Sequence, residues 1–353
     1  MALEVYWYDF ICFGIVGVAV LGSLVIIWWK ERYFQIGDAG LYQWLLAGRA
    51  EQNGGSSPAG DSSREELGSG VLPKSHVGTS QLWCSCWKGV QPGWLLGTRV
   101  VSFLIMAGLL FWDYEDYGYS VFMYYTEWTF GLVMIYFAVG SVVSAYGCWL
   151  YYFPSPYLET IANGFSRQDM EDGANGPTIT SREEEINGAK LMQLYTQKQI
   201  LERAGFWGYL MQIVFQAAAG AVVFTDIIFW CLIVPFLSTV RLGLNPLMGC
   251  MHTMNAFFIL LDTSLNSLSF PWFRISYFVL WTAIYVIVQW VIHACGYTSW
   301  PYPFLVLSTP WAPLWYFCLA VISLPCYVIY ALIVRAKYNL FPKWFHQSFV
   351  KIC

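Results

Sequence analysis

Charged residues are scarce in this chain. Lys, Arg, Asp and Glu make up 11% of its 353 residues, whereas 58% are hydrophobic and 19% are aromatic. A soluble domain carries about 25% charged residues, so this composition excludes an ordinary soluble protein. We expect a multi-pass integral membrane protein surrounded by membrane lipids. The net charge of −4 gives no basis for nucleic-acid binding.

Several catalytic and cofactor motifs are also missing. The chain has no His-Glu-x-x-His sequence, no clustered histidine boxes, no glycine-rich phosphate loop and no Gly-x-Ser-x-Gly elbow. Cys84 and Cys86 are not followed by a second Cys or His pair at zinc-site spacing, which favours a structural or palmitoylated pair. We therefore expect neither a metal nor a cofactor.

Long apolar runs are what the chain has instead. Runs of about 20 apolar residues are long enough to cross a bilayer as helices. The N-terminus lacks the basic segment of a signal peptide, so the first run is expected to be a retained anchor. The sequence predicts an all-α polytopic bundle of about seven helices, near 10–29, 94–112, 122–151, 206–236, 247–269, 273–296 and 311–335.

Hydrophilic segments divide these runs. Residues 1–29 are expected to form the N-terminal segment and first helix. Residues 30–93 are expected to form a loop whose Gly- and Ser-rich linker is predicted to be disordered. Residues 94–336 form a six-helix core. Its long loop, 152–205, contains either a short amphipathic helix or an ordinary solvated connector, two equally supported interpretations. Residues 337–353 form a tail.

The positive charges indicate the orientation. Cytosolic loops of membrane proteins retain Lys and Arg. With a non-cytosolic N-terminus, every Lys and Arg except Arg241 falls on the cytosolic side, and the outer loops at 113–120 and 296–310 contain none. The C-terminus is then cytosolic. The sequence specifies neither an oligomeric state nor a choice between an endomembrane and the plasma membrane.

The fifth predicted span carries an unusual polar stripe. At about 100° per residue, its polar side chains fall within an arc of roughly 100° around His252. A rise of 1.5 Å per residue places Thr126, Thr129 and His252 at a common level, about 6–11 Å below the outer surface. The stripe consists of His252, Asn255, Asp262, Thr263 and Asn266.

Two interpretations of the polar groups in the spans remain open. Gln, Thr and Asn commonly form hydrogen bonds between membrane helices. Ionisable groups within membrane spans usually face the bundle interior or a polar cavity, and they often mark a functional site. Further polar stripes are formed by Gln212, Gln216 and Asp226 in the fourth span, and by Thr282, Gln289 and His293 in the sixth.

A threonine and a histidine at one level indicate nucleophilic catalysis. A threonine hydroxyl needs an adjacent base, and neutral imidazole is the usual base near pH 7. Thr126 with His252 forms such a pair if the third and fifth helices touch, with Thr129 as the alternative hydroxyl. Asn255, one turn below His252, is a candidate oxyanion donor. Candidate acids to orient His252 are Asp113, Glu115 and Asp116 in the outer loop.

Three stretches resemble a known family. The sequences YYTEWTF (124–130), HTMNAFFILLD (252–262) and WPYPFLVLSTPWAPLWY (300–316) are similar to the rolling-stone and androgen-induced protein group of multi-pass membrane proteins, in its plant-type form. Androgen-induced members are threonine hydrolases of fatty acid esters of hydroxy fatty acids. The resemblance implies a fatty acyl ester substrate, with Thr126 as nucleophile and His252 as its partner. The context of His252 is closer to the rolling-stone branch, for which no hydrolysis is implied.

A non-enzymatic carrier or adaptor is the alternative. In a carrier, Asp226, His252, Asp262 and His293 would line a path for protons or solute. Such a path must continue to the cytosolic side, whereas an esterase needs only an outer pocket. The depth of the polar groups therefore discriminates between the two functions.

Overall fold

The chain folds into long helices that lie side by side. The computed structural model describes residues 6–52, 78–153, 204–236 and 246–350. For residues 32–52 it describes the backbone alone. There is no strand in these ranges, only one isolated bridge between Trp87 and Phe349. The long helices are α1 (Trp7–Gln52), α2 (Pro92–Tyr117), α3 (Tyr125–Tyr152), α6 (Phe206–Ile228), α8 (Pro246–Leu265), α9 (Ile275–Ala294) and α10 (Ala312–Trp344).

Short segments connect the helices. Between Ile228 and Val234 the chain forms a π-helical turn, η4 (Phe229–Ile233), which leads into α7 (Val234–Phe236). The 3₁₀ segments are η2 (Thr79–Leu82), η3 (Gly118–Met123), η5 (Trp272–Arg274) and η6 (Pro303–Leu305).

The all-α polytopic bundle is confirmed. Six segments of the described chain are long and apolar enough to cross a membrane: Trp7–Glu31, Pro92–Met123, Tyr125–Tyr152, Phe206–Phe236, Trp272–Ala294 and Ala312–Trp344. The remaining predicted span, the fifth along the chain, is α8, whose 20 residues extend about 30 Å. Buried polar side chains, among them His252 and Asp262, lower its apolar content. The chain is therefore a multi-pass membrane protein.

The first helix is longer than predicted. It does not end at residue 29 but continues to Gln52, because the residues that follow contain no proline and many good helix formers. Helical structure thus occupies the start of the predicted 30–93 loop. The linker residues 53–77 lie outside the described residues. Residues 154–203, which contain the predicted amphipathic helix of the 152–205 loop, also lie outside them.

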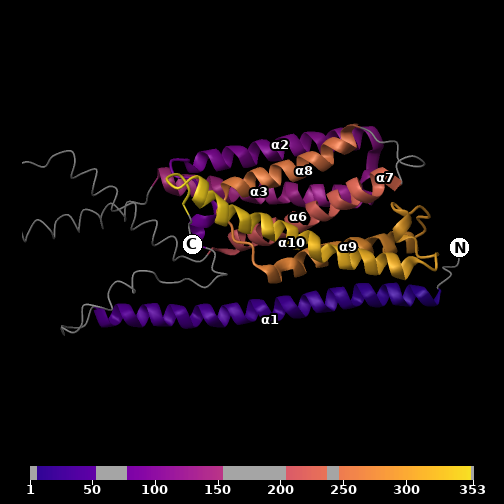
Figure 1. Ribbon diagram of the computed structural model, residues 1–353, viewed down its shortest axis with the longest axis horizontal. Helices are drawn as coiled ribbons and strands as arrows, with labels where there is room; N and C mark the ends of the chain where they lie inside the picture. The colour runs from indigo at the N-terminus through magenta and orange to yellow at the C-terminus, as the bar shows by residue number, and fades with distance from the viewer. Residues whose placement is uncertain (1–5, 53–77, 154–203, 237–245, 351–353) are drawn as a thin grey trace, which may run out of the picture.

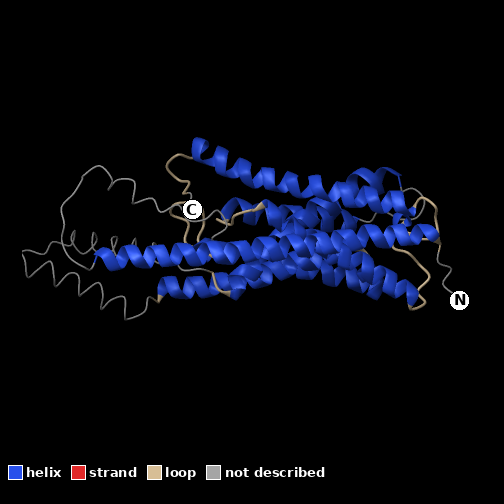
Figure 2. Ribbon diagram, turned by 90° about the horizontal axis from the view of Figure 1, so that it is seen from below, coloured by secondary structure: helices blue, strands red, loops and turns tan. Residues whose placement is uncertain are grey.

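Helix α6 occupies the centre of the bundle. It packs against α3 and α8 on one side and against α9 and α10 on the other, and α1 lies beyond α9 and α10 (Figure 1). The helices run along a common axis, with the loops at the two ends (Figure 2). Gly220 permits the close approach of α6, because a Cβ there would lie 2.9 Å from the ring of Phe278 and 3.1 Å from that of Tyr327.

A buried ion pair connects α2, α3 and α8. Arg99 Nε lies 2.9 Å from Asp262 Oδ1, and Arg99 also donates to the Leu82 carbonyl at 2.9 Å. The second oxygen of Asp262 accepts hydrogen bonds from the Tyr136 hydroxyl and, at 2.8 Å, from the Asn266 amide. Both charged side chains are almost fully buried. The deep polar groups of the fifth span thus have structural partners.

The segment before α2 closes the same end of the bundle. Cys86 N–H donates to the Leu265 carbonyl at 3.0 Å, and Val350 N–H donates to the Cys86 carbonyl at 2.8 Å. Cys86 is buried and Cys84 is half-buried. Burial raises the pKa of the Cys84 thiol to about 12, because the charged thiolate is poorly solvated there. This placement supports the structural interpretation of the cysteine pair.

Helix α1 is attached near both ends of its membrane span. Near the N-terminus, the Tyr8 hydroxyl donates to the Ser308 carbonyl at 3.3 Å. At the other end, Glu31 accepts a hydrogen bond from Tyr277 at 3.2 Å and lies 3.9 Å from Arg274 Nε. Between these attachments α1 covers both α9 and α10, which hardly touch each other.

Candidate active site

Thr126 lies in the first turn of α3. The turn η3 ends at Met123, and Tyr124 is extended, with φ −92° and ψ 145°, before the helix begins at Tyr125. The N–H of Tyr125 donates to the hydroxyl of Tyr302 at 3.1 Å, which attaches the start of α3 to the loop before α10. Thr126 is therefore held at a helix N-terminus, where backbone N–H groups lack intrahelical partners and the helix dipole is positive.

Thr126, His252 and Asp226 form a chain of contacts. The Thr126 hydroxyl lies 3.4 Å from His252 Nε2, and His252 Nδ1 lies 3.2 Å from Asp226 Oδ1. His252 is 3% exposed. A carboxylate at Nδ1 favours the tautomer with its proton on Nδ1, which leaves the Nε2 lone pair facing the threonine. The three residues come from three helices and have the arrangement of a nucleophile, a base and an orienting acid.

The π-helical turn η4 contacts the proposed base, His252. The turn η4 begins three residues after Asp226, and the ring of Phe229 stacks on the imidazole of His252 with centroids 3.7 Å apart and planes 13° apart. Pro235 cannot donate to the carbonyl four residues earlier, which accounts for the interrupted α-helical pattern. Such turns occur frequently at functional sites.

The sequence did not identify Asp226 as the orienting acid. The acids of the loop after α2 were only candidates to orient His252, and the contact comes from α6. Asp226 belongs to the predicted polar stripe of the fourth span, so its presence in the membrane was the available signal. Its angular position relative to His252 depends on how α6 and α8 are rotated against each other, which hydropathy does not reveal.

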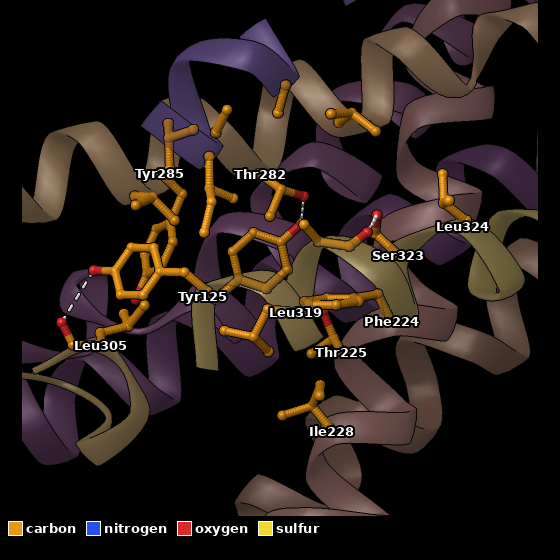
Figure 3. A pocket seen from close by; sticks show the side chains of 18 of the residues that line it. Tyr125, Phe224, Thr225, Ile228, Thr282, Tyr285, Leu305, Leu319, Ser323 and Leu324 are labelled. Carbon is orange, nitrogen blue, oxygen red and sulfur yellow. Dashed lines mark hydrogen bonds between the residues drawn. The ribbon is translucent and has the colours of Figure 1, made fainter. Parts of the chain in front are cut away.

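A large apolar cavity begins at Thr126 and His252. It has a volume of about 340 Å³ and is lined by α1, α3, α6, α8, α9, α10 and the loop before α10. On α1 the lining extends from Ile15 to Ile26, about 16 Å along the helix axis. In Figure 3 the side chains of Phe224, Ile228 and Leu319 surround the space, and the Tyr125 hydroxyl meets Thr282 at 2.8 Å.

A second, small cavity lies against the same two residues. Its volume is about 30 Å³, and it is lined by Tyr124, Thr126, Glu127, Phe229, Ile233, Met248, Met251, His252 and Tyr302. Five residues line both cavities: Thr126, Phe229, Ile233, His252 and Tyr302. Burial and the negative charge of Glu127 raise the pKa of Tyr302, so its hydroxyl keeps its proton at neutral pH.

The other two predicted site residues lie elsewhere. Thr129 is fully buried and pairs with Thr225, with 3.0 Å between the hydroxyls, so it does not face His252. Asn255 is also fully buried, and neither side-chain atom has a hydrogen-bond partner among the described residues. Neither residue lines the large or the small cavity. The structure thus brings Thr126 and His252 together and leaves Thr129 and Asn255 outside the site.

The remaining polar stripes mostly connect helices. Gln212 donates to Ser269 at 2.8 Å and accepts from Arg274, while Gln289 donates to the Met123 carbonyl at 3.0 Å. His293 stacks on Trp300, with centroids 4.3 Å apart, and does not line either cavity. Among the described residues, no group of three or more His, Cys, Asp or Glu side chains is placed to hold a metal ion.

Comparison of the chain with protein-family models, with curated proteins and with solved structures finds no match.

Proposed function

We propose that this membrane protein is a threonine hydrolase of lipid esters. The observation that carries the proposal is the contact chain from Thr126 through His252 to Asp226 at one end of an apolar cavity. A base within reach of a hydroxyl and an acid behind the base are the elements that activate a weak nucleophile. The distance of 3.4 Å between Thr126 and His252 is long, as is common before substrate binds.

The chemistry follows from these positions. His252 Nε2 takes the Thr126 proton as Oγ1 attacks the acyl carbonyl carbon. Asp226 stabilises the imidazolium that forms, and His252 then gives the proton to the departing alkoxide. The acyl group remains on Thr126 as an ester, which water cleaves in a second step.

Backbone amides are the proposed oxyanion donors. Asn255 was the sequence-based candidate, but it lines neither cavity. The N–H groups of the first turn of α3 lie next to the nucleophile and have no intrahelical partner. They replace Asn255 in this role, supported by the positive end of the helix dipole.

The large cavity suits an acyl chain. Its lining is dominated by aliphatic and aromatic side chains, and α1 separates it from the surrounding lipid. A lipid ester can enter beside α1 and place its carbonyl at Thr126, with the chain along the helix axes. Fatty acid esters of hydroxy fatty acids, the class implied by the family resemblance, have this form.

The position of the deep polar groups supports a hydrolase over a carrier. A carrier needs a polar path that continues toward the cytosolic side. In the described part of the chain, Asp262 is bound to Arg99, and neither residue lines the large or the small cavity at Thr126. An adaptor function has no specific observation in its favour.

Turnover of a purified sample tests the proposal. The protein in mild detergent is incubated with a fatty acid ester of a hydroxy fatty acid, and the released acids are measured. Thr126→Ala and His252→Ala should abolish turnover, and Thr129→Ala should retain it. Thr253→Ala is the matched control, because this threonine adjoins His252 but is exposed and donates to the Gly249 carbonyl. Full activity in His252→Ala contradicts the proposal, as does an inactive, well-folded wild type over a range of esters.

A further inference from the structure

The small cavity lies beside the proposed nucleophile, at the start of α3. It shares Thr126 and His252 with the large cavity, so the two residues stand between an apolar chamber and a small space whose wall includes polar side chains. A volume of about 30 Å³ has room for one or two water molecules. A buried water also needs two or more polar partners, and the wall offers the side chains of Thr126, Glu127, His252 and Tyr302.

Glu127 is the group in this wall without an assigned partner. Its Oε2 atom is buried and has no hydrogen-bond partner among the described residues. A buried polar atom without a protein partner is costly, and such atoms commonly bind an ordered water. Glu127 lines the small cavity but not the large one, so its carboxylate can accept a hydrogen bond from a water in the small cavity.

We propose that Glu127 positions the hydrolytic water for cleavage of the acyl-Thr126 intermediate, an inference that rests on the proposed hydrolase function. The water accepts from Tyr302 and donates to Glu127 and His252. Its oxygen attacks the acyl carbonyl carbon, and one proton passes to His252 Nε2. The bond between the carbonyl carbon and Thr126 Oγ1 breaks, and His252 returns the proton to Oγ1. The products are the free acid and the original threonine.

A purely structural role for Glu127 makes a different prediction. Glu127 lies in the first turn of α3, where a carboxylate interacts favourably with the helix dipole. Loss of that interaction would disturb the position of Thr126 itself. Acylation and deacylation would then slow together, and thermal stability would fall. A water-positioning residue affects the second step alone.

Single-turnover kinetics separates the two roles. The full-length protein in detergent is mixed with a chromogenic acyl ester, and the burst of alcohol, the steady-state rate and the mass of Thr126-containing peptides are followed. In Glu127→Ala we expect an unchanged burst rate, a steady-state rate lowered at least about tenfold and accumulated acyl-Thr126. Glu127→Gln, which keeps one oxygen acceptor and nearly the same shape, should show a smaller defect of the same kind.

Glu115→Gln is the matched control, because Glu115 lies near the end of α2, close in the chain to the start of α3, and is exposed. Equal loss of burst and steady-state rates in Glu127→Gln, or no loss in either variant, overturns the proposal while the hydrolase function stands. A folded wild type with neither a burst nor an acylated Thr126 overturns both. Accumulated acyl-Thr126 in the Glu127 variants with a normal burst supports both.

Discussion

Asp226 lies behind the imidazole rather than beside the proposed substrate. Its carboxylate contacts His252 Nδ1 at 3.2 Å and lines neither cavity. Its proposed contribution is to hold the tautomer and orientation of His252 and to stabilise the imidazolium. Asp226 is therefore a positioning residue, and its effects should appear in the rate of the chemical step and not in substrate binding.

Asp226→Asn should lower kcat at least about 100-fold with KM nearly unchanged. The asparagine amide can donate to Nδ1, which favours the proton on Nε2 and removes the base that faces Thr126. Steady-state kinetics with a lipid ester measures both constants, and thermal unfolding checks the fold. Asp116→Asn is the control, because Asp116 is exposed near the C-terminal end of α2. A rise in KM without a fall in kcat would contradict the assigned role.

Thr126 and His252 could be predicted from the sequence, whereas the role of Asp226 could not. Thr126 and His252 were matched by depth, because a constant rise per residue sets the level of a side chain in a membrane helix. The sequence left Thr126 and Thr129 as alternatives, and only the rotation of α3 separates them: Thr126 faces His252, and Thr129 faces Thr225. The position of Asp226 next to His252 depends on helix packing, which no local pattern reveals.

At the scale of helices, α1 determines the size of the large cavity. Its inner face lines the cavity from Ile15 to Ile26, and Gly22 lies on that face. A Cβ at Gly22 would meet no atom within 4 Å, so a side chain there can extend into the cavity without displacing a neighbour. Gly22 lies about 10 Å along the axis from Ile15. An extended acyl chain of about eight carbons spans that length, given carbon–carbon bonds of about 1.5 Å.

Gly22→Leu should therefore discriminate by acyl length. We expect kcat/KM for a palmitoyl ester to fall about tenfold or more, while a hexanoyl ester is hydrolysed at the wild-type rate. The comparison uses both esters with the same alcohol. Gly14→Leu is the matched control, since Gly14 is exposed, has the same open space and does not line the cavity. An equal change for both chain lengths would contradict this placement of the acyl chain.

The spans themselves were predictable because their composition alone identifies them. Hydropathy identified the six segments of the described chain that can cross a membrane. It also predicted a span at α8, whose apolar content is too low for that helix to be included among the six. What it missed was the continuation of α1 to Gln52 and the π turn after Ile228. Both depend on backbone hydrogen bonding beyond the apolar run, not on the partition of side chains between water and lipid.

On the scale of the whole molecule, the two ends of the bundle serve different purposes. Both cavities meet at Thr126, and the large one extends from there to Ile275 and Ser276 at the start of α9. The end opposite Thr126 is held by the buried pair of Arg99 and Asp262, by Tyr136 and Asn266, and by the segment before α2. Removal of one partner from a buried pair leaves the other charge without compensation, which is strongly destabilising.

Asp262→Ala should accordingly lower the free energy of unfolding by about 3–5 kcal/mol, because Arg99 stays buried and unpaired. Thermal or denaturant unfolding in detergent measures this loss, with exposed Thr253→Ala as the control. The double variant Arg99→Met with Asp262→Leu should recover part of the stability. The same variants separate the candidate functions: a hydrolase retains kcat below the unfolding transition because Asp262 lines neither cavity. A carrier that used Asp262 in its path would lose activity in the folded double variant, and that result would reassign the deep polar groups to function.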